Sequence, residues 1–359
     1  PAGRMVSTRS AASANSASSA SARPFRFGER WWPEGESDAA ALRGRGWYAL
    51  YIAAIVAVAA LLLLRAPPPC TSTLAAAATS ELVAPWVLLL FRGAACALVL
   101  GVVVSLWRKE AVVTLETVDR RDVVLLSSGL WRFQGLTQWQ FITIGVYFGL
   151  TSALTYLGMR TPPEALEQRG WDTAASPPAC AAASLLGVAL SLALLTTSVT
   201  SFVLLPWALT KERASPTPGG AASSNVAMFF SVEALLMHNA NALLLVIDLL
   251  LGKLHVDVRD IAYCLLFGGA YVFWHQFVRY HRTRTLLYFF LNWQSPHALK
   301  ILLALLSAIA LFFGVGYLLS EHLRGTRWGA QVALLGLLCI MRVRVPPGAR
   351  APAAPHKAE

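Results

Sequence analysis

Long runs of hydrophobic residues dominate this chain, and short polar segments separate them. A membrane-spanning helix needs about 20 mostly apolar residues, because the hydrocarbon core of a bilayer is about 30 Å thick. Seven runs meet this requirement, at 47–64, 85–107, 139–159, 181–207, 229–251, 261–278 and 298–319. The pattern therefore predicts an all-α fold, a polytopic transmembrane helix bundle of seven or eight spans.

An eighth run, 328–341, is short enough to be either a span or an interfacial helix. Lys and Arg collect in cytosolic loops of membrane proteins, so their distribution tests the number of crossings. With a cytosolic N-terminus and eight crossings, 21 of these residues lie on the cytosolic side and 7 on the other. With seven crossings the division is 17 to 11. The charges favour eight spans.

The composition excludes a soluble enzyme domain, since 56% of the residues are hydrophobic and 14% are charged. Loop arginines account for the net charge of +11, so we expect membrane lipid and not nucleic acid as the partner. No C-x-x-C pair or other metal-ligand spacing occurs, and we expect no metal and no cofactor.

The chain divides into a membrane domain, 47–345, and two polar ends. Residues 1–46 form a basic tail rich in Ser and Ala, without the apolar core of a secretory signal peptide. That composition fits either an organellar transit peptide or a disordered cytosolic tail. Residues 346–359 are a second disordered tail. An endomembrane or the plasma membrane is the favoured location if the first tail is cytosolic.

Cys70 and Cys180 both fall in loops on the non-cytosolic side of this topology. In an oxidising compartment they would form a disulfide between the first two outer loops. Two free thiols are the alternative, because spacing alone does not show that the two side chains meet.

Ionisable side chains at bilayer depth are costly and mark functional or paired positions. Arg92 in the second span and Asp248 in the fifth lie in the same membrane layer, which predicts a structural ion pair between them. In the fifth span, His238, Asn241 and Asp248 form one polar stripe at helical spacing. The stripe serves either as hydrogen-bonding contact between helices or as part of a catalytic or ligand site.

The third span begins with Trp139-x-x-x-Thr143 and continues with Gly145-x-x-x-Gly149, a motif that lets helices approach closely. Thr143 points away from the glycine face. A membrane threonine usually bonds to its own backbone, so the residue alone does not indicate a nucleophile.

Trp139-x-x-x-Thr143, with His238-x-x-Asn241 and Tyr271-x-x-Trp274 later in the chain, resembles the androgen-induced protein family of multi-pass lipid hydrolases. In that family a membrane threonine and a histidine act on fatty acid esters of hydroxy fatty acids. The stretch from His238 to Asp248, with Asn292-Trp293-x-x-Pro296, is similar to the related rolling stone family. The likeness covers about 84–320, and Phe289 and Asn292 replace the proline and aspartate of the rolling stone pattern.

The resemblance implies Thr143 as nucleophile and His238 as its base in an intramembrane lipid ester hydrolase. Asn239 or Asn241 would supply an oxyanion donor, and Tyr271 and His275 would line the same pocket. Thr143 lies about 6 Å and His238 about 13 Å below the cytosolic surface, at 1.5 Å per helical residue, so helix tilt must close that gap. The alternatives are a non-catalytic rolling stone-type membrane protein and haem ligation by His238 and His275.

Overall fold

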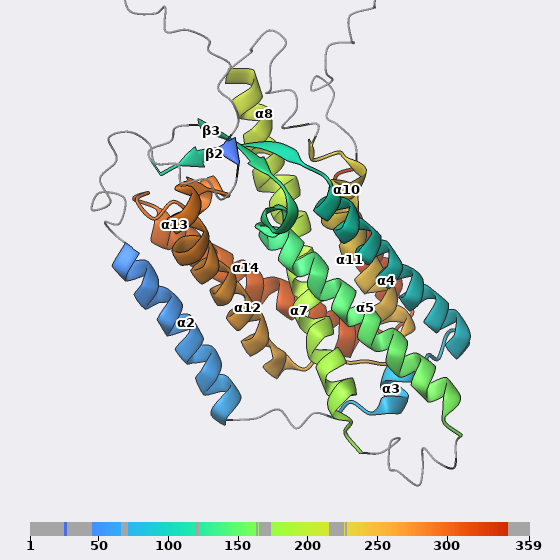
Figure 1. Cartoon of the computed structure of the whole chain (residues 1–359). Coiled ribbons are helices and arrows are strands. Elements are labelled where there is room, and N and C mark those ends of the chain that lie inside the picture. Colours follow the sequence, from blue (N-terminus) through green and yellow to red (C-terminus); the bar gives the residue numbers. More distant parts are fainter. Residues whose placement is uncertain are drawn as a thin grey trace, which may run out of the picture.

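A computed structural model describes residues 25–26, 45–65, 71–118, 122–162, 164, 174–214, 226 and 228–343. Most of the tails predicted at 1–46 and 346–359 lies outside these residues. The described chain is an all-α helix bundle, as predicted (Figure 1). Seven of its helices are long and apolar enough to cross a membrane: Gly46–Arg65, Pro85–Arg108, Leu136–Arg160, Pro177–Thr210, Val232–Leu251, Val258–Thr283 and Ala298–Leu323.

Several spans are built from more than one helical segment. The helices are α2 (Arg45–Arg65), α3 (Leu74–Ala78), α4 (Pro85–Arg108), α5 (Leu136–Arg160), α7 (Pro177–Val199), α8 (Leu205–Ala214), α10 (Val232–Leu235), α11 (Asn241–Leu251), α12 (Ile261–Phe273), α13 (Tyr280–Thr283), α14 (Ala298–Leu318) and α15 (Gly329–Ile340). Short 3₁₀ turns occur at Gly129–Phe133, Val258–Asp260 and Phe289–Leu291. Four π-helical segments, Thr200–Leu204, Leu236–Ala240, Trp274–Arg279 and Leu319–Leu323, continue α7, α10, α12 and α14.

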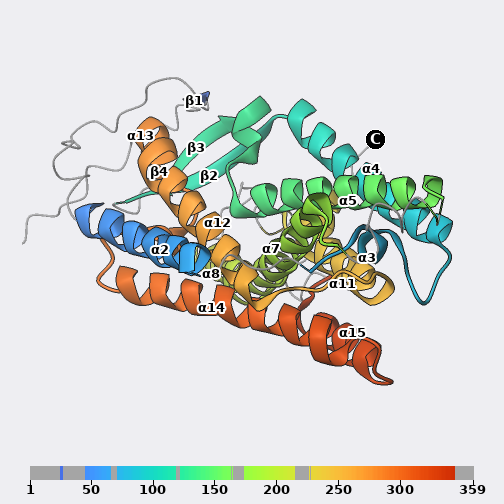
Figure 2. The ribbon, with the colours of Figure 1, turned by 90° about the horizontal axis from the view of Figure 1, so that it is seen from below.

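Helix α7 is the centre of the bundle (Figure 2). It packs against α5, α11, α12 and α14, and it is the most buried of the seven spans. Its inner faces carry small residues such as Ala182, Gly187 and Ala193, which let neighbouring backbones approach closely. The site described below is built around the C-terminal part of this helix.

Helices α4 and α5 pack through the predicted glycine face. A Cβ atom on Gly145 would lie 2.9 Å from Val99 Cγ1, and one on Gly149 would lie 3.6 Å from Cys96 Sγ. The G-x-x-x-G motif therefore serves as a contact surface between two spans, and Thr143 does not take part in that surface.

The last apolar run forms α15, which packs beside α11. Its 12 residues rise about 18 Å at 1.5 Å per residue, less than the thickness of the hydrocarbon core. The carbonyl of Arg342, just beyond this helix, accepts a hydrogen bond from Asn239 in the fifth span. The described chain therefore returns to the level of Asn239 in the fifth span, and the eighth crossing stays a prediction.

A small sheet lies at the end of the bundle that also holds α8 and the start of α10 (Figure 1). Strands β2 (Ala111–Thr117) and β3 (Asp122–Ser127) pair antiparallel with Ala111 opposite Ser127. Strand β1 (Phe25–Arg26) joins β3 in parallel, and β4 (Thr285–Leu286) joins β2 antiparallel. Two short apolar runs on either side of a charged segment of the sequence indicate the hairpin, whereas nothing in the two-residue strands β1 and β4 marks them in the sequence.

Candidate functional site

The structure does not bring Thr143 and His238 together. The Thr143 hydroxyl donates to the carbonyl of Trp139 one turn earlier in α5, at 3.0 Å. Within the described residues, no hydrogen bond joins Thr143 to His238. Near this level of α5, Gln140 is the side chain that contacts the fifth span, and it lies about 60° round the helix from Thr143. The pair implied by the resemblance is therefore not formed.

His238 instead contacts two threonines where α7 ends and its π-helical continuation begins. Its Nδ1 atom lies 3.0 Å from Thr200 Oγ1, and the Thr197 hydroxyl donates to its backbone carbonyl. His238 and Thr200 each lie in a π-helical segment. Such segments are rare and occur frequently at functional sites.

The hydrogen bonding of Thr200 differs from that of most hydroxyls in these spans. Thr143, Thr151 and Thr155 each donate to a backbone carbonyl four residues earlier. Thr200 makes its contact across to another helix, with an imidazole nitrogen that can accept a proton when the ring is neutral. A hydroxyl beside an imidazole is the arrangement that activates a nucleophile.

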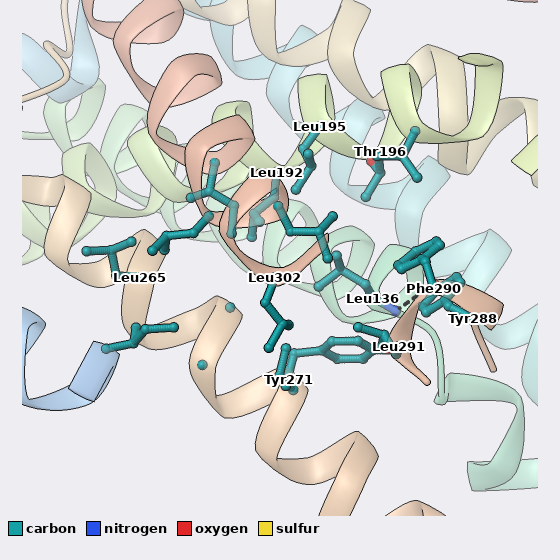
Figure 3. Close-up of a pocket in the computed structure, with 18 of the residues that line it drawn as sticks. Leu136, Leu192, Leu195, Thr196, Leu265, Tyr271, Tyr288, Phe290, Leu291 and Leu302 are labelled. Atoms are coloured by element: carbon teal, nitrogen blue, oxygen red, sulfur yellow. Dashed lines mark hydrogen bonds between the residues drawn. The ribbon is translucent and has the colours of Figure 1, made fainter. Parts of the chain in front are cut away.

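A cavity of about 90 Å³ lies beside Thr200 (Figure 3). Five spans line it, and most of its wall is aliphatic. Polar atoms come from the side chains of Thr137, Thr196, Thr200, Tyr271 and Tyr288, and the aliphatic wall includes Leu192, Leu195, Leu265, Leu302, Leu305 and Ile309. The cavity is therefore a small apolar space with several hydroxyl groups on its wall.

Gln140 joins the neighbourhood of this cavity, although no pattern in the sequence singles it out. Its Oε1 atom accepts hydrogen bonds from Asn241 Nδ2 at 3.3 Å and from Thr196 Oγ1 at 3.5 Å. Its Nε2 atom is buried and has no partner among the described residues. Thr196 lies one turn before Thr200 on the same face of α7, so the unused amide donor lies near the threonine and histidine pair.

The asparagines proposed as oxyanion donors are engaged elsewhere. Asn239 Nδ2 donates to the carbonyl of Arg342 at 3.0 Å. Asn241 Nδ2 donates to Gln140, and its Oδ1 atom accepts from the amide of Ala242 at 2.6 Å. Both side-chain amides therefore make contacts within the protein. Gln140 Nε2, which has no partner among the described residues, is the better candidate for the oxyanion donor.

Tyr271 and His275 occupy different environments, although both were expected to line the pocket. Tyr271 does line the cavity, and its hydroxyl donates to the carbonyl of Gln134 at 3.1 Å. His275 is fully buried outside the cavity wall, and its Nε2 atom accepts a hydrogen bond from the amide of Leu287 at 3.2 Å. One nitrogen of each ring is thus engaged within the protein, His238 Nδ1 with Thr200 and His275 Nε2 with a backbone amide.

The polar stripe of the fifth span ends in the ion pair expected from the sequence. Arg92 Nε lies 2.8 Å from Asp248 Oδ1, and both side chains are buried. Arg92 also donates to Thr155 Oγ1 at 2.8 Å and to the carbonyl of Ala77, while the Tyr147 hydroxyl donates to Asp248. These contacts join the second, third and fifth spans, which fits a structural role.

Two expectations concern cysteines and metals. Cys70 lies outside the described residues, so the bridge to Cys180 stays a prediction; Cys180 Sγ lies 3.9 Å from the carbonyl of Ser72. In the part of the chain that the structure describes, no three His, Cys, Asp or Glu residues are grouped as metal ligands.

Comparison of the chain with protein-family models, curated proteins and solved structures finds no match. The likeness to the androgen-induced and rolling stone families therefore stays a prediction from the motifs, and the geometry of the site carries the functional argument.

Proposed function

We propose that this chain is an intramembrane hydrolase of lipid esters in which Thr200, and not Thr143, is the nucleophile and His238 is its base. The observation that carries the proposal is the 3.0 Å contact between Thr200 Oγ1 and His238 Nδ1 beside an apolar cavity. The reaction class agrees with the hydrolases that the sequence motifs resemble, while the nucleophile differs.

The reaction begins when His238 Nδ1 takes the proton of Thr200 as Oγ1 attacks the ester carbonyl. His238 then gives that proton to the departing alkoxide, which leaves as an alcohol, and the acyl group remains on Thr200. A water molecule, deprotonated by the same imidazole, hydrolyses the acyl-threonine to a carboxylic acid and restores the hydroxyl.

Negative charge develops on the carbonyl oxygen of the ester during the attack, and a hydrogen-bond donor must stabilise it. The buried Gln140 Nε2 atom, which has no partner in the described chain, is the group that would supply it. A donor already held by its neighbours costs no reorganisation when the charge develops, and removal of one such donor typically lowers the rate by about 10²–10³-fold.

The alternative is a non-catalytic membrane protein in which the Thr197, Thr200 and His238 contacts only join α7 to the fifth span. Hydrogen bonds between membrane helices contribute about 0.6 to 2 kcal/mol each, so this role is physically sufficient. This non-catalytic function requires no reactive hydroxyl group on Thr200.

A fluorophosphonate probe separates the two functions. On the hydrolase proposal, the wild-type protein is labelled, and Thr200→Ala and His238→Ala abolish the labelling. Thr143→Ala is the matched control, because it removes the same group from a neighbouring span and leaves the Thr200 contact intact; its labelling should equal that of the wild type. An unlabelled wild type would support the non-catalytic function, and loss of labelling in Thr143→Ala alone would return the role of nucleophile to Thr143.

A further inference from the structure

A second, polar cavity of about 510 Å³ lies at one end of the bundle. Its wall includes Ser184 near the start of α7, the segment 255–260 before α12, and Glu321 at the end of the seventh span. Figure 1 shows α3 and the beginning of α7 at the end of the bundle opposite the small sheet and α8. The helical stretch from Ser184 to Thr200 rises about 24 Å at 1.5 Å per residue, so this cavity is separate from the site proposed for hydrolysis.

Asp260 places a buried carboxylate in the wall of this cavity. Only 2% of the residue is exposed. The hydroxyl of Ser184 donates a hydrogen bond to Asp260 Oδ1 at 2.8 Å. Helix α7 packs against this segment, because a Cβ atom on Gly187 would lie 3.6 Å from Asp260 Cβ. The hydrophobic pattern does not single out this carboxylate, since Asp260 stands just before the apolar run at 261–278.

The charge of Asp260 has no counter-ion in the part of the chain that the structure describes. None of the ion pairs there includes this residue. The Ser184 hydroxyl and the N-terminus of α12 both favour an ionised carboxylate, but neither carries a full positive charge. A buried charge without a counter-ion is costly, and within a membrane span it indicates a functional position. The arrangement is therefore suited to a cation that comes from outside the described chain.

Other groups in the wall also favour a cation. Asp257 and Glu321 contribute two further carboxylates, and Tyr317 contributes an aromatic ring, a group whose face attracts cations. The hydroxyl groups of Thr71 and Ser72 can accept hydrogen bonds from a bound donor. Acceptors of hydrogen bonds thus come from several separate segments around the cavity.

Two basic residues line the cavity without forming an ion pair with Asp260. His255 Nδ1 lies 2.7 Å from Glu321 Oε1, in a pair that is largely exposed. Arg259 is exposed, and its backbone amide donates to Asp257 Oδ1 at 2.9 Å. The buried carboxylate is therefore left for a ligand, while the basic side chains lie in exposed positions.

We propose that this cavity binds a primary ammonium group on a short apolar stem, with Asp260 as its counter-ion. A primary ammonium has three N–H donors, which the carboxylate and hydroxyl oxygens of the wall can accept. Ala183, Val256 and Val258 provide apolar surface for the stem. A cavity of this volume suits a small organic molecule. The described residues contain no group of three His, Cys, Asp or Glu that could hold a metal ion, which favours an organic cation.

The test uses the full-length protein in phosphatidylcholine nanodiscs, because the quaternary ammonium of that lipid has no N–H to donate. A hexylamine that carries a diazirine is the photolabel, and hexylamine, hexanol and hexanoate compete with it. Mass spectrometry locates the labelled peptides. We expect the label on peptides that contain Ser184 or residues 255–260.

Hexylamine should compete at about tenfold lower concentration than hexanol, because a hydrogen bond to a charged group typically contributes at least that much affinity. Hexanoate should compete no better than hexanol. Asp260→Asn should remove the advantage of hexylamine, since the amide keeps the shape of the side chain and loses its charge. Glu81→Gln is the matched control, because it removes a carboxylate that pairs with Lys253, outside the cavity wall, and should leave the advantage unchanged.

Equal competition by hexylamine and hexanol in the wild type would overturn the proposal, and so would an advantage of hexylamine that survives in folded Asp260→Asn. If Asp260→Asn does not fold, the wild-type comparison and the position of the label decide. A label confined to peptides outside the cavity wall contradicts the site.

The ammonium group can belong to a soluble amine or to the ethanolamine headgroup of a phospholipid. Replacement of part of the phosphatidylcholine by phosphatidylethanolamine distinguishes these two sources. Weaker labelling in the mixed nanodiscs supports binding of the lipid headgroup, and unchanged labelling supports binding of a soluble amine. Thr200→Ala should leave labelling unchanged in both lipids, because ammonium binding does not depend on the proposed hydrolysis.

Discussion

Arg92 Nε and Asp248 Oδ1 lie 2.8 Å apart and fix the second span against the fifth. Because both side chains are buried, loss of either charge leaves the other without a counter-ion in a low-dielectric interior. We expect Asp248→Asn to destabilise the protein by about 3–5 kcal/mol, measured as thermal unfolding in detergent. Glu81→Gln is the control, since it removes a surface pair with Lys253 and should leave the unfolding temperature nearly unchanged.

An apolar replacement of the whole pair extends this prediction. In Arg92→Met with Asp248→Leu no unpaired charge remains, so most of the lost stability should return. A double variant as unstable as Asp248→Asn would show that the attraction itself, and not the cost of an unpaired charge, dominates at this position.

The contact between α4 and α5 depends on the absence of a side chain at Gly145. A Cβ atom there would lie 2.9 Å from Val99 Cγ1, so Gly145→Ala should destabilise the protein by about 1–3 kcal/mol through overpacking. Val99→Ala in the same chain should recover part of the loss. Gly101→Ala is the matched control, because a Cβ at Gly101 meets nothing within 4 Å and alanine favours the helix. Equal effects of Gly145→Ala and Gly101→Ala on the thermal unfolding temperature would contradict a steric contact between position 145 and Val99.

The architecture follows from the sequence more directly than the site does. Long apolar runs must become helices in a bilayer, because no other open structure satisfies the backbone there. The pairing of Arg92 with Asp248 was foreseeable for a similar reason, since two opposite charges at one depth have few other partners. The hairpin β2–β3 was recognisable from two short apolar runs on either side of a charged segment.

The site was not foreseeable in the same way, because it depends on how helices rotate against one another. The motif indicates Thr143, but α5 turns Gln140 toward the fifth span, and the π-helical segments of the fourth and fifth spans bring Thr200 beside His238. A π-helical segment shifts the residues that follow it round the helix, and spacing counted at 3.6 residues per turn cannot include that shift.

The two ends of the chain test the number of crossings. Eight spans place both termini on the cytosolic side, as the distribution of Lys and Arg favours. Epitope tags at the two ends should therefore behave alike. Both should be inaccessible to antibody in intact cells and become accessible when the membrane is permeabilised. Tags on opposite sides would show that the run containing α15 does not cross.

The outer loops provide a further prediction. The carbonyl of Ser72 accepts a hydrogen bond from the amide of Ser176 at 3.0 Å and lies 3.9 Å from Cys180 Sγ. Cys70 is two residues from Ser72, so a Cys70–Cys180 disulfide is expected in an oxidising compartment. Peptide mass spectrometry without reduction should find the linked peptides, and alkylation of both cysteines in the unreduced protein would contradict the bridge.

The position of a covalent adduct distinguishes Thr200 from Thr143 as the nucleophile. After reaction of the wild-type protein with a fluorophosphonate or a slowly hydrolysed lipid ester, fragment mass spectrometry identifies the modified side chain. We expect an adduct on Thr200 that requires the imidazole of His238 and forms normally in Thr143→Ala. An adduct on Thr143, or a wild-type protein that forms none, would contradict catalysis by the Thr200 and His238 pair.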